Sequence, residues 1–237
     1  MRNVGATPAE ASTAFATSVS DVLDFWFPRG LDADEAAHRR QFQWWFGGGA
    51  DAGIEARFAP LVEAAATGAL DAWATTPRGR LALIIVLDQF ARRLYRDTAE
   101  AGRYESRAVA LALDGLDGAD HDRLATVWEK LFFAMPLSRS ESLALQKRAV
   151  ELCDDLLSMA PAHLRRFYLF AAGQARGHRD VIARFGRHPE RNEQLGRVST
   201  AQERAYLAAA GRVHDRVSRE GDFFSPSYFP IPRTERG

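Results

Sequence analysis

Apolar residues recur along this chain at steps of three and four positions, the spacing of one face of an α-helix. The alternation of apolar and polar residues that marks a half-buried strand does not occur in runs of four or more. The pattern therefore predicts an all-α protein of about eight or nine helices. They are expected near residues 20–27, 32–46, 51–66, 77–95, 104–115, 121–134, 139–159 and 162–185, with a last one opening at Thr200.

Several of these helices carry sequence signals for their ends. Pro77 suits a first helical position, and Gly186 can end a helix in the left-handed conformation. Ser138 to Glu141 and Thr200 to Glu203 both have the form of a capping box, in which a hydroxyl and a glutamate satisfy two backbone N–H groups. Short connections between such helices are typical of antiparallel hairpins.

The chain is expected to form a single helical domain over residues 18–220. Residues 1–17 are rich in Ala, Ser and Thr with few large apolar groups, and they predict a flexible lead-in. Residues 221–237 contain three prolines and four aromatics without periodicity. They predict an irregular tail, packed down or loose.

Composition excludes several classes of protein. The 31 basic and 31 acidic residues cancel, so no global field favours nucleic acid or an anionic membrane. The single cysteine, Cys153, forbids an internal disulfide, and the longest apolar run, residues 81–87, is far shorter than a membrane helix requires. We expect a cytoplasmic protein.

Polar groups on apolar helical faces are the candidate functional residues, because burying them without partners costs free energy. Asp88 continues the apolar stripe of the helix over residues 77–95, with Arg92 four positions later. Gln89 stands in the same relation to Arg93. Asp88, Gln89 and Arg92 are therefore candidates either for a structural ion pair at the edge of the core or for a ligand groove.

Two further helices carry such groups. His178 occupies a position where the stripe of its helix calls for an apolar residue, and Gln146 extends the apolar face of the helix over residues 139–159. A histidine in this position is either a satisfied core residue or a group that faces a ligand and transfers protons. An amide there either bonds to the backbone or contacts a ligand.

The densest unusual segment is residues 184–197, which is rich in arginine. From Arg176 to Arg197 there are six Arg against three acidic residues, a local surplus of 6 − 3 = +3 in a neutral chain. Asn192 and Gly196 can both take positive φ, so the loop can fan several guanidinium groups toward one carboxylate or phosphate. The alternative is that the arginines tie the loop to helix ends and acidic neighbours. The candidate ligand-binding residues here are Arg184, Arg187, Arg191, Asn192 and Arg197, together with Glu141.

Signals for cofactors are weak. The pair His121 and Asp122 is found in helical metal phosphohydrolases, but those sites need further ligands that this chain supplies only through His38 and Asp180. The glycine loops that bind phosphates or dinucleotides are missing, as is the nucleophile elbow. We predict neither a metal nor another cofactor.

Several motifs closely resemble those of the bacterial domain-of-unknown-function family nine-two-four, over about residues 20–210. They are residues 22–27 (VLDFWF), 87–90 (LDQF) with Arg92, Tyr95 and Arg96, 135–137 (MPL) with Ser140, Glu141 and Gln146, and His178 with 184–187 (RFGR), Pro189, Arg191, Asn192, 195–197 (LGR), Ser199 and Thr200. The resemblance implies a tetratricopeptide-like right-handed superhelix of antiparallel helical hairpins and no established activity. It also implies histidine before the Ser-Glu pair and phenylalanine after Gly-Arg, where this chain has Arg139 and His188.

Three hypotheses about function follow. In the first, a groove binds an anionic small molecule or an acidic peptide end through the arginines. In the second, the protein is a hydrolase or lyase in which His178 transfers protons and Asp88 orients it or the substrate. In the third, all these groups brace a structural scaffold. Both functional hypotheses predict that Asp88, Gln146, His178 and the arginine loop gather around one cavity.

Overall fold

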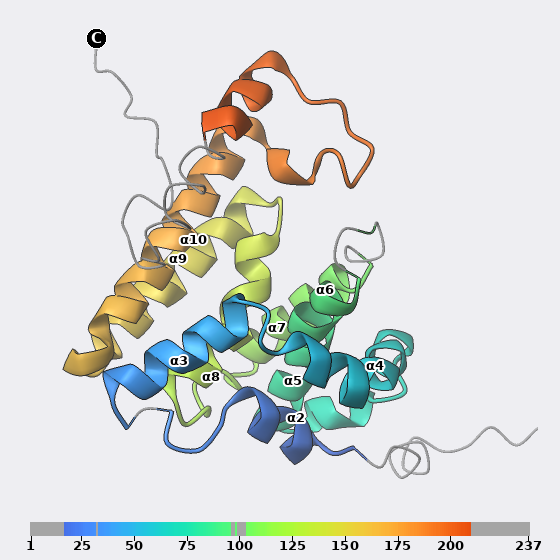
Figure 1. Cartoon of the computed structure of the whole chain (residues 1–237), viewed down its shortest axis with the longest axis vertical. Helices are drawn as coiled ribbons and strands as arrows, with labels where there is room; N and C mark the ends of the chain where they lie inside the picture. The colour runs from blue at the N-terminus through green and yellow to red at the C-terminus, as the bar shows by residue number, and fades with distance from the viewer. Residues whose placement is uncertain (1–16, 32, 96–97, 99–102, 210–237) are drawn as a thin grey trace, which may run out of the picture. The chain divides into compact units, whose positions relative to one another are not determined.

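The computed structural model describes residues 17–31, 33–95, 98 and 103–209. The regular secondary structure of these residues is helical (Figure 1). The described residues between 19 and 185 form nine α-helices, and a further helix begins at residue 201. The nine are α2 (Val19–Trp26), α3 (Glu35–Phe46), α4 (Asp51–Thr67), α5 (Pro77–Ile84), α6 (Ala91–Leu94), α7 (Glu105–Asp117), α8 (Val127–Ala134), α9 (Leu143–Met159) and α10 (Arg165–Phe185). No strand occurs among the described residues, which confirms the all-α prediction.

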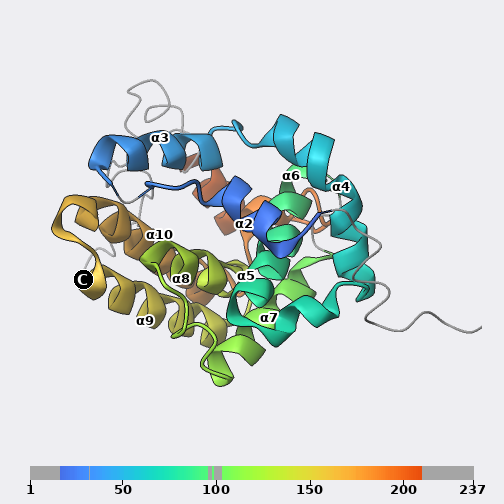
Figure 2. The same cartoon turned by 90° about the horizontal axis from the view of Figure 1, so that it is seen from below.

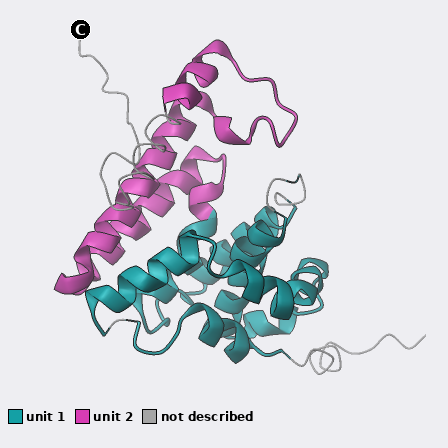
Figure 3. Cartoon of the chain, viewed as in Figure 1, with its two compact units in different colours: residues 1–136 teal, residues 137–237 magenta. Residues whose placement is uncertain are grey.

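The chain divides into two compact units, unit 1 (residues 1–136) and unit 2 (residues 137–237) (Figure 3). The single domain over residues 18–220 and the tetratricopeptide-like superhelix stay predictions. The predicted lead-in over residues 1–17, except for Thr17, and the tail over residues 221–237 lie outside the described residues.

The sequence signals for helix ends were mostly correct. Pro77 is the first residue of α5, Gly186 ends α10 at φ 70°, and Thr200 and Glu203 form the predicted capping box. The capping box predicted at Ser138 was wrong. The chain instead continues from α8 into a short 3₁₀ helix, Met135–Arg139, and α9 begins after Ser142 with no side-chain cap. Glu141, the glutamate of that predicted capping box, accepts hydrogen bonds from Arg197 and from the His188 N–H instead.

Aromatic packing holds the N-terminal part of unit 1 together. Trp26 is fully buried and contacts the rings of Trp45, Phe90 and Phe132 at centroid distances of 6.1, 5.5 and 5.6 Å. Buried aromatic side chains of this size are among the largest contributors to a core, and their edge-on contacts add to the area they bury. These rings tie α2, α3 and α8 to the helical stretch that contains Asp88.

That stretch is interrupted by one wide turn. Between α5 and α6 the backbone forms a π-helix, Ile85–Phe90, whose residues are all buried. A π-turn inserts extra residues into a helix and shifts the faces on either side of it. As a result both Asp88 and Gln89 are buried, with exposed fractions of 2% and 4%. The apolar stripe predicted this burial for Asp88.

In unit 2, α9 and α10 lie side by side along most of their length (Figures 1 and 2). Their shared core contains Cys153 and Leu156 from α9 and Phe167, Ala175 and Ile182 from α10. This packing of α9 against α10 fixes the position of the C-terminal end of α10, and of the loop that follows it, within unit 2. None of the helices among the described residues is both long and apolar enough to cross a membrane.

Candidate functional site

The loop after α10 has a defined backbone between residues 186 and 200. Gly186 turns the chain at positive φ, its N–H bonding back to the Ile182 carbonyl at 2.8 Å. The short 3₁₀ helix Pro189–Arg191 follows, and Gly196 turns the chain again at φ 63°. Positive φ was also expected at Asn192, but that residue has φ −60° because it closes the 3₁₀ turn with an N–H bond to the Pro189 carbonyl.

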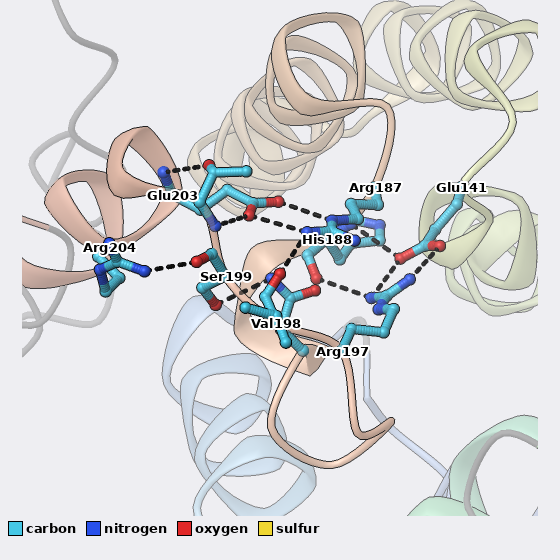
Figure 4. Close-up of polar contacts among 10 residues, drawn as sticks. Glu141, Arg187, His188, Arg197, Val198, Ser199, Glu203 and Arg204 are labelled. Carbon is cyan, nitrogen blue, oxygen red and sulfur yellow. Dashed lines mark hydrogen bonds and ion pairs between the residues drawn. The ribbon is translucent and has the colours of Figure 1, made fainter.

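Arg187 braces this loop to the helix that follows. Its guanidinium donates to both carboxylate oxygens of Glu203, at 2.7 and 2.9 Å, and to the Val198 carbonyl at 3.0 Å (Figure 4). The side chain of Glu203 is only 3% exposed, and its carboxylate also accepts the Thr200 N–H. The hydrogen bond from Arg187, with those from Thr200, lowers the pKa of Glu203 to about 2. This pair has the geometry of an internal tie.

Arg197 forms a second fork at Glu141, from the far side of the loop (Figure 4). Its two terminal nitrogens donate to the two Glu141 oxygens at 2.7 and 2.9 Å, and the His188 backbone N–H donates to the same carboxylate at 2.8 Å. Arg197 also donates to the His188 carbonyl at 3.1 Å. Although burial favours the neutral acid, the hydrogen bonds from Arg197 and His188 keep the pKa of Glu141 below its usual value. Three donors thus converge on one carboxylate supplied by the protein itself.

Two histidine rings meet beside this fork. The rings of His178 and His188 lie 5.7 Å apart between centroids and are perpendicular. Burial lowers the pKa of His178 to about 4, and the electrostatic effects of His188 and Arg139 act in the same direction. His178 is therefore neutral at neutral pH.

His188 is the more enclosed of the two, with 3% of its side chain exposed. Its Nδ1 lies 3.1 Å from a carboxylate oxygen of Glu190, and its Nε2 has no hydrogen-bond partner among the described residues. Burial alone would raise the pKa of Glu190, but the contact with His188 outweighs it and the pKa is lowered. A buried ring nitrogen without a hydrogen-bond partner lowers the free energy of unfolding, so the placement of His188 costs this loop stability.

The remaining arginines of the segment differ in their partners. Arg176 pairs with Asp154, and Arg179 pairs with its neighbour Asp180. Arg184 is exposed, lies 4.8 Å above the ring of its own neighbour Phe185, and has no ion pair within the described residues. Arg191 is half-buried, and its charge contributes to the lowered pKa of His178.

Gln146 and Asn192 organise the backbone around the forks. Gln146 is fully buried, and its amide nitrogen donates to the carbonyls of Ser138 and Ser140, each at 2.7 Å. It thereby holds the segment that presents Glu141. Asn192 is 1% exposed and donates to the Ser199 hydroxyl at 3.0 Å. Both amides therefore donate hydrogen bonds within unit 2, Gln146 to the segment before α9 and Asn192 within the loop after α10.

The predicted residues of the π-helical stretch lie in unit 1. The Asp88 carboxylate accepts a hydrogen bond from the Gln89 side chain, which also points to the Met135 sulfur at 3.1 Å. Arg93, expected beside Gln89, instead pairs with Asp51 at 3.1 Å and donates to the Trp45 carbonyl. Arg92 is half-buried. The shared cavity of Asp88 with Gln146, His178 and the arginine loop stays a prediction.

Sequence reasoning missed three participants in the site: Glu190, Glu203 as an ion-pair partner, and His188. Glu203 was recognised only as a capping residue, since nothing in the local sequence pairs it with Arg187. Among the described residues no group of three or more His, Cys, Asp or Glu could hold a metal, and His121 contacts Asp122 at 3.5 Å.

Comparisons with known proteins agree with the helical fold. A family model described as bacterial protein of unknown function (DUF924) matches residues 22–211. A solved structure of a protein of unknown function from Agrobacterium tumefaciens is similar to this chain, with a TM-score of 0.59 and 31% sequence identity over 80% of this chain and 96% of that one. No curated protein matches.

Proposed function

The chain belongs to the bacterial family DUF924, and for this member we propose binding of a small anion or an acidic peptide end at the loop between α10 and residue 200. Arg184, with Arg191, contacts the ligand in this proposal, while Arg187 and Arg197 hold the loop in shape. The ligand class follows from the guanidinium group, which binds carboxylates and phosphates through paired hydrogen bonds.

The observation that carries the proposal is the different use of neighbouring arginines. Arg187 and Arg197 each donate to two oxygens of an internal carboxylate. Arg184, in the last turn of α10 where the loop begins, is exposed and has no ion pair in the described part of the chain. A guanidinium held over an aromatic ring, as Arg184 is over Phe185, keeps its N–H donors directed outward. Positive charge next to a helix C-terminus also offsets the negative end of the helix dipole.

An enzymatic function has one observation in its favour, the contact between His178 and His188. A general base works best when its pKa is near the working pH, and the pKa of His178 at about 4 makes it a weak base at neutral pH. Cysteine chemistry is also unsupported, because burial raises the pKa of the Cys153 thiol to about 12. The geometry favours binding over hydrolase or lyase chemistry.

We further propose that the protein acts in the cytoplasm on a small-molecule or peptide ligand. The proposal includes neither nucleic acid nor a membrane, in keeping with the balanced charge of the chain.

Replacing Arg184 with alanine tests the proposal. The variant should change the free energy of unfolding by no more than about 0.5 kcal/mol, as expected for an exposed side chain. It should lose the stabilisation that phosphate or a dicarboxylate gives the wild-type protein, which would amount to about 2.7 kcal/mol at 100 times the dissociation constant. Thermal melts with and without these anions measure both effects.

Arg179→Ala is the matched control, because it removes an equal charge from the same helix but from a residue already paired with Asp180. Its response to anions should equal that of the wild-type protein. Equal loss of anion response in both variants would reduce the effect to net charge, and an unchanged response in Arg184→Ala would contradict the proposal. Equally large losses of stability without anion in alanine variants of all four loop arginines would favour the scaffold hypothesis.

A further inference from the structure

Unit 1 contains a second place where positive charge gathers, formed by residues other than those of the arginine loop. A hollow of about 310 Å³ lies between residues 28–31 and one face of α3. Arg29 lines it from the loop side, and Arg40 and Trp44 line it from the helix. Its volume is at the lower end of the range for small-molecule sites.

The walls of this hollow are held in place by buried contacts. The Gln41 side chain donates to the Trp26 carbonyl at 3.1 Å, and the Trp45 indole donates to the same oxygen at 2.9 Å. The ring of the fully buried His38 lies with Nδ1 3.2 Å from the Leu31 carbonyl. The loop therefore has a defined shape beside α3 before any ligand arrives, which lowers the entropic cost of binding.

Among the described residues that line the hollow, the charged ones are both arginines. Arg29 and Arg40 are both exposed, and neither has a hydrogen bond or an ion pair within the described residues. None of the residues that line the hollow is acidic. Arg39, the neighbour of Arg40 on α3, differs in pairing with Glu35 at 3.3 Å. Two guanidinium groups that line one concave surface can both donate hydrogen bonds to an anion placed in it.

Trp44 adds a flat apolar wall to this charge. It stands four positions after Arg40, so the two side chains share one face of α3. Its indole is half-buried and contacts the rings of Phe25 and Trp26, at centroid distances of 5.1 and 5.8 Å. An indole held in this way presents a surface on which a planar group can stack.

We propose that this hollow binds an oxyanion attached to a flat ring, with Arg29 and Arg40 on the carboxylate or phosphate and Trp44 against the ring. The site is separate in sequence from the arginine loop and does not depend on the function proposed for that loop. Carboxylate and phosphate share the same guanidinium chemistry, so the test compares both.

Titration calorimetry on the full chain with benzoate and with phenyl phosphate tests the site, with cyclohexanecarboxylate and inorganic phosphate as comparison ligands. The wild-type protein should bind at least one aromatic probe with a dissociation constant of about 1 mM or tighter. Arg29→Ala and Arg40→Ala should each weaken that binding by at least about fivefold, because each removes a charge-assisted pair of hydrogen bonds. Both residues are exposed, so these variants should fold normally.

Arg39→Ala is the matched control on α3 and should bind the aromatic probe as the wild-type protein does. Because the loop proposed above also binds carboxylates and phosphates, the effects of Arg29→Ala and Arg40→Ala should persist in the Arg184→Ala background. Trp44→Leu should weaken the aromatic probe toward the affinity of cyclohexanecarboxylate. The proposal is overturned if the wild-type protein does not bind either aromatic probe, or if Arg39→Ala weakens binding as much as Arg40→Ala. Loss of binding in Arg184→Ala alone would assign the probe to the loop instead.

Discussion

Acidification from pH 7 to pH 5 should destabilise the protein by about 2 kcal/mol through His178 alone. Its pKa is about 4 in the folded protein against an ordinary value of 6.5. Between these two values the unfolded chain binds a proton that the folded chain does not, so stability is lost as the pH falls through this window. Each pH unit inside the window is worth about 1.4 kcal/mol.

Denaturant unfolding at pH 7 and pH 5 checks this expectation, with His178→Gln as the variant. Glutamine does not titrate, so the loss of stability between the two pH values should shrink by about 2 kcal/mol relative to the wild-type protein. The lowered pKa values of Glu141, Glu190 and Glu203 act mainly below about pH 4.5, which lies beneath the measured range from pH 7 to pH 5.

His121 needs its own variant, because burial lowers its pKa as well. His121→Gln should remove a different share of the pH dependence and leave that of His178 in place. If His178→Gln keeps the full wild-type loss between pH 7 and pH 5, His178 is not held neutral in the folded protein.

Glu141→Ala is expected to cost about 1–3 kcal/mol of unfolding free energy, because it removes the carboxylate that binds Arg197 and the His188 N–H. The cost stays below that of breaking a fully buried pair, since 31% of the Glu141 side chain and 23% of the Arg197 side chain are exposed and water can replace part of the interaction. Arg197→Ala should cost a similar amount.

The same variant should respond to added carboxylate. Acetate or propionate can occupy the space left by the Glu141 side chain and bind the same three donors, so it should raise the melting temperature of Glu141→Ala more than chloride does at equal ionic strength. The wild-type protein should show a smaller difference, because its own Glu141 carboxylate already accepts from these donors. Glu193→Ala, which removes an exposed carboxylate from the loop that Glu141 binds, is the control and should neither lose as much stability nor gain the acetate response.

Helix positions were predictable because their causes are local. Pro77 begins α5 since its fixed φ suits a first helical turn, and Gly186 ends α10 since it takes positive φ without strain. The burial of Asp88 followed from its place on an apolar stripe. In each case the residues that decide the outcome lie within about four positions of one another.

The partners of the loop arginines could not be predicted in this way. Arg187 and Arg197 were candidates for one anion site, yet they bind Glu203 and Glu141, which are 16 and 56 positions away in the sequence. The Ser138 capping box failed for the same reason, because its glutamate gains more from Arg197 and the His188 N–H than from capping α9.

The sequence by itself therefore determined the helical class, most helix ends and the concentration of arginine near the end of α10, all of which depend on neighbouring residues. Only the tertiary structure decided which guanidinium groups are bound by internal carboxylates, that His188 lies against His178, and that Arg29 and Arg40 line one hollow with Trp44. These outcomes depend on how packed helices bring distant side chains within hydrogen-bonding distance. Periodicity along the chain does not contain that information.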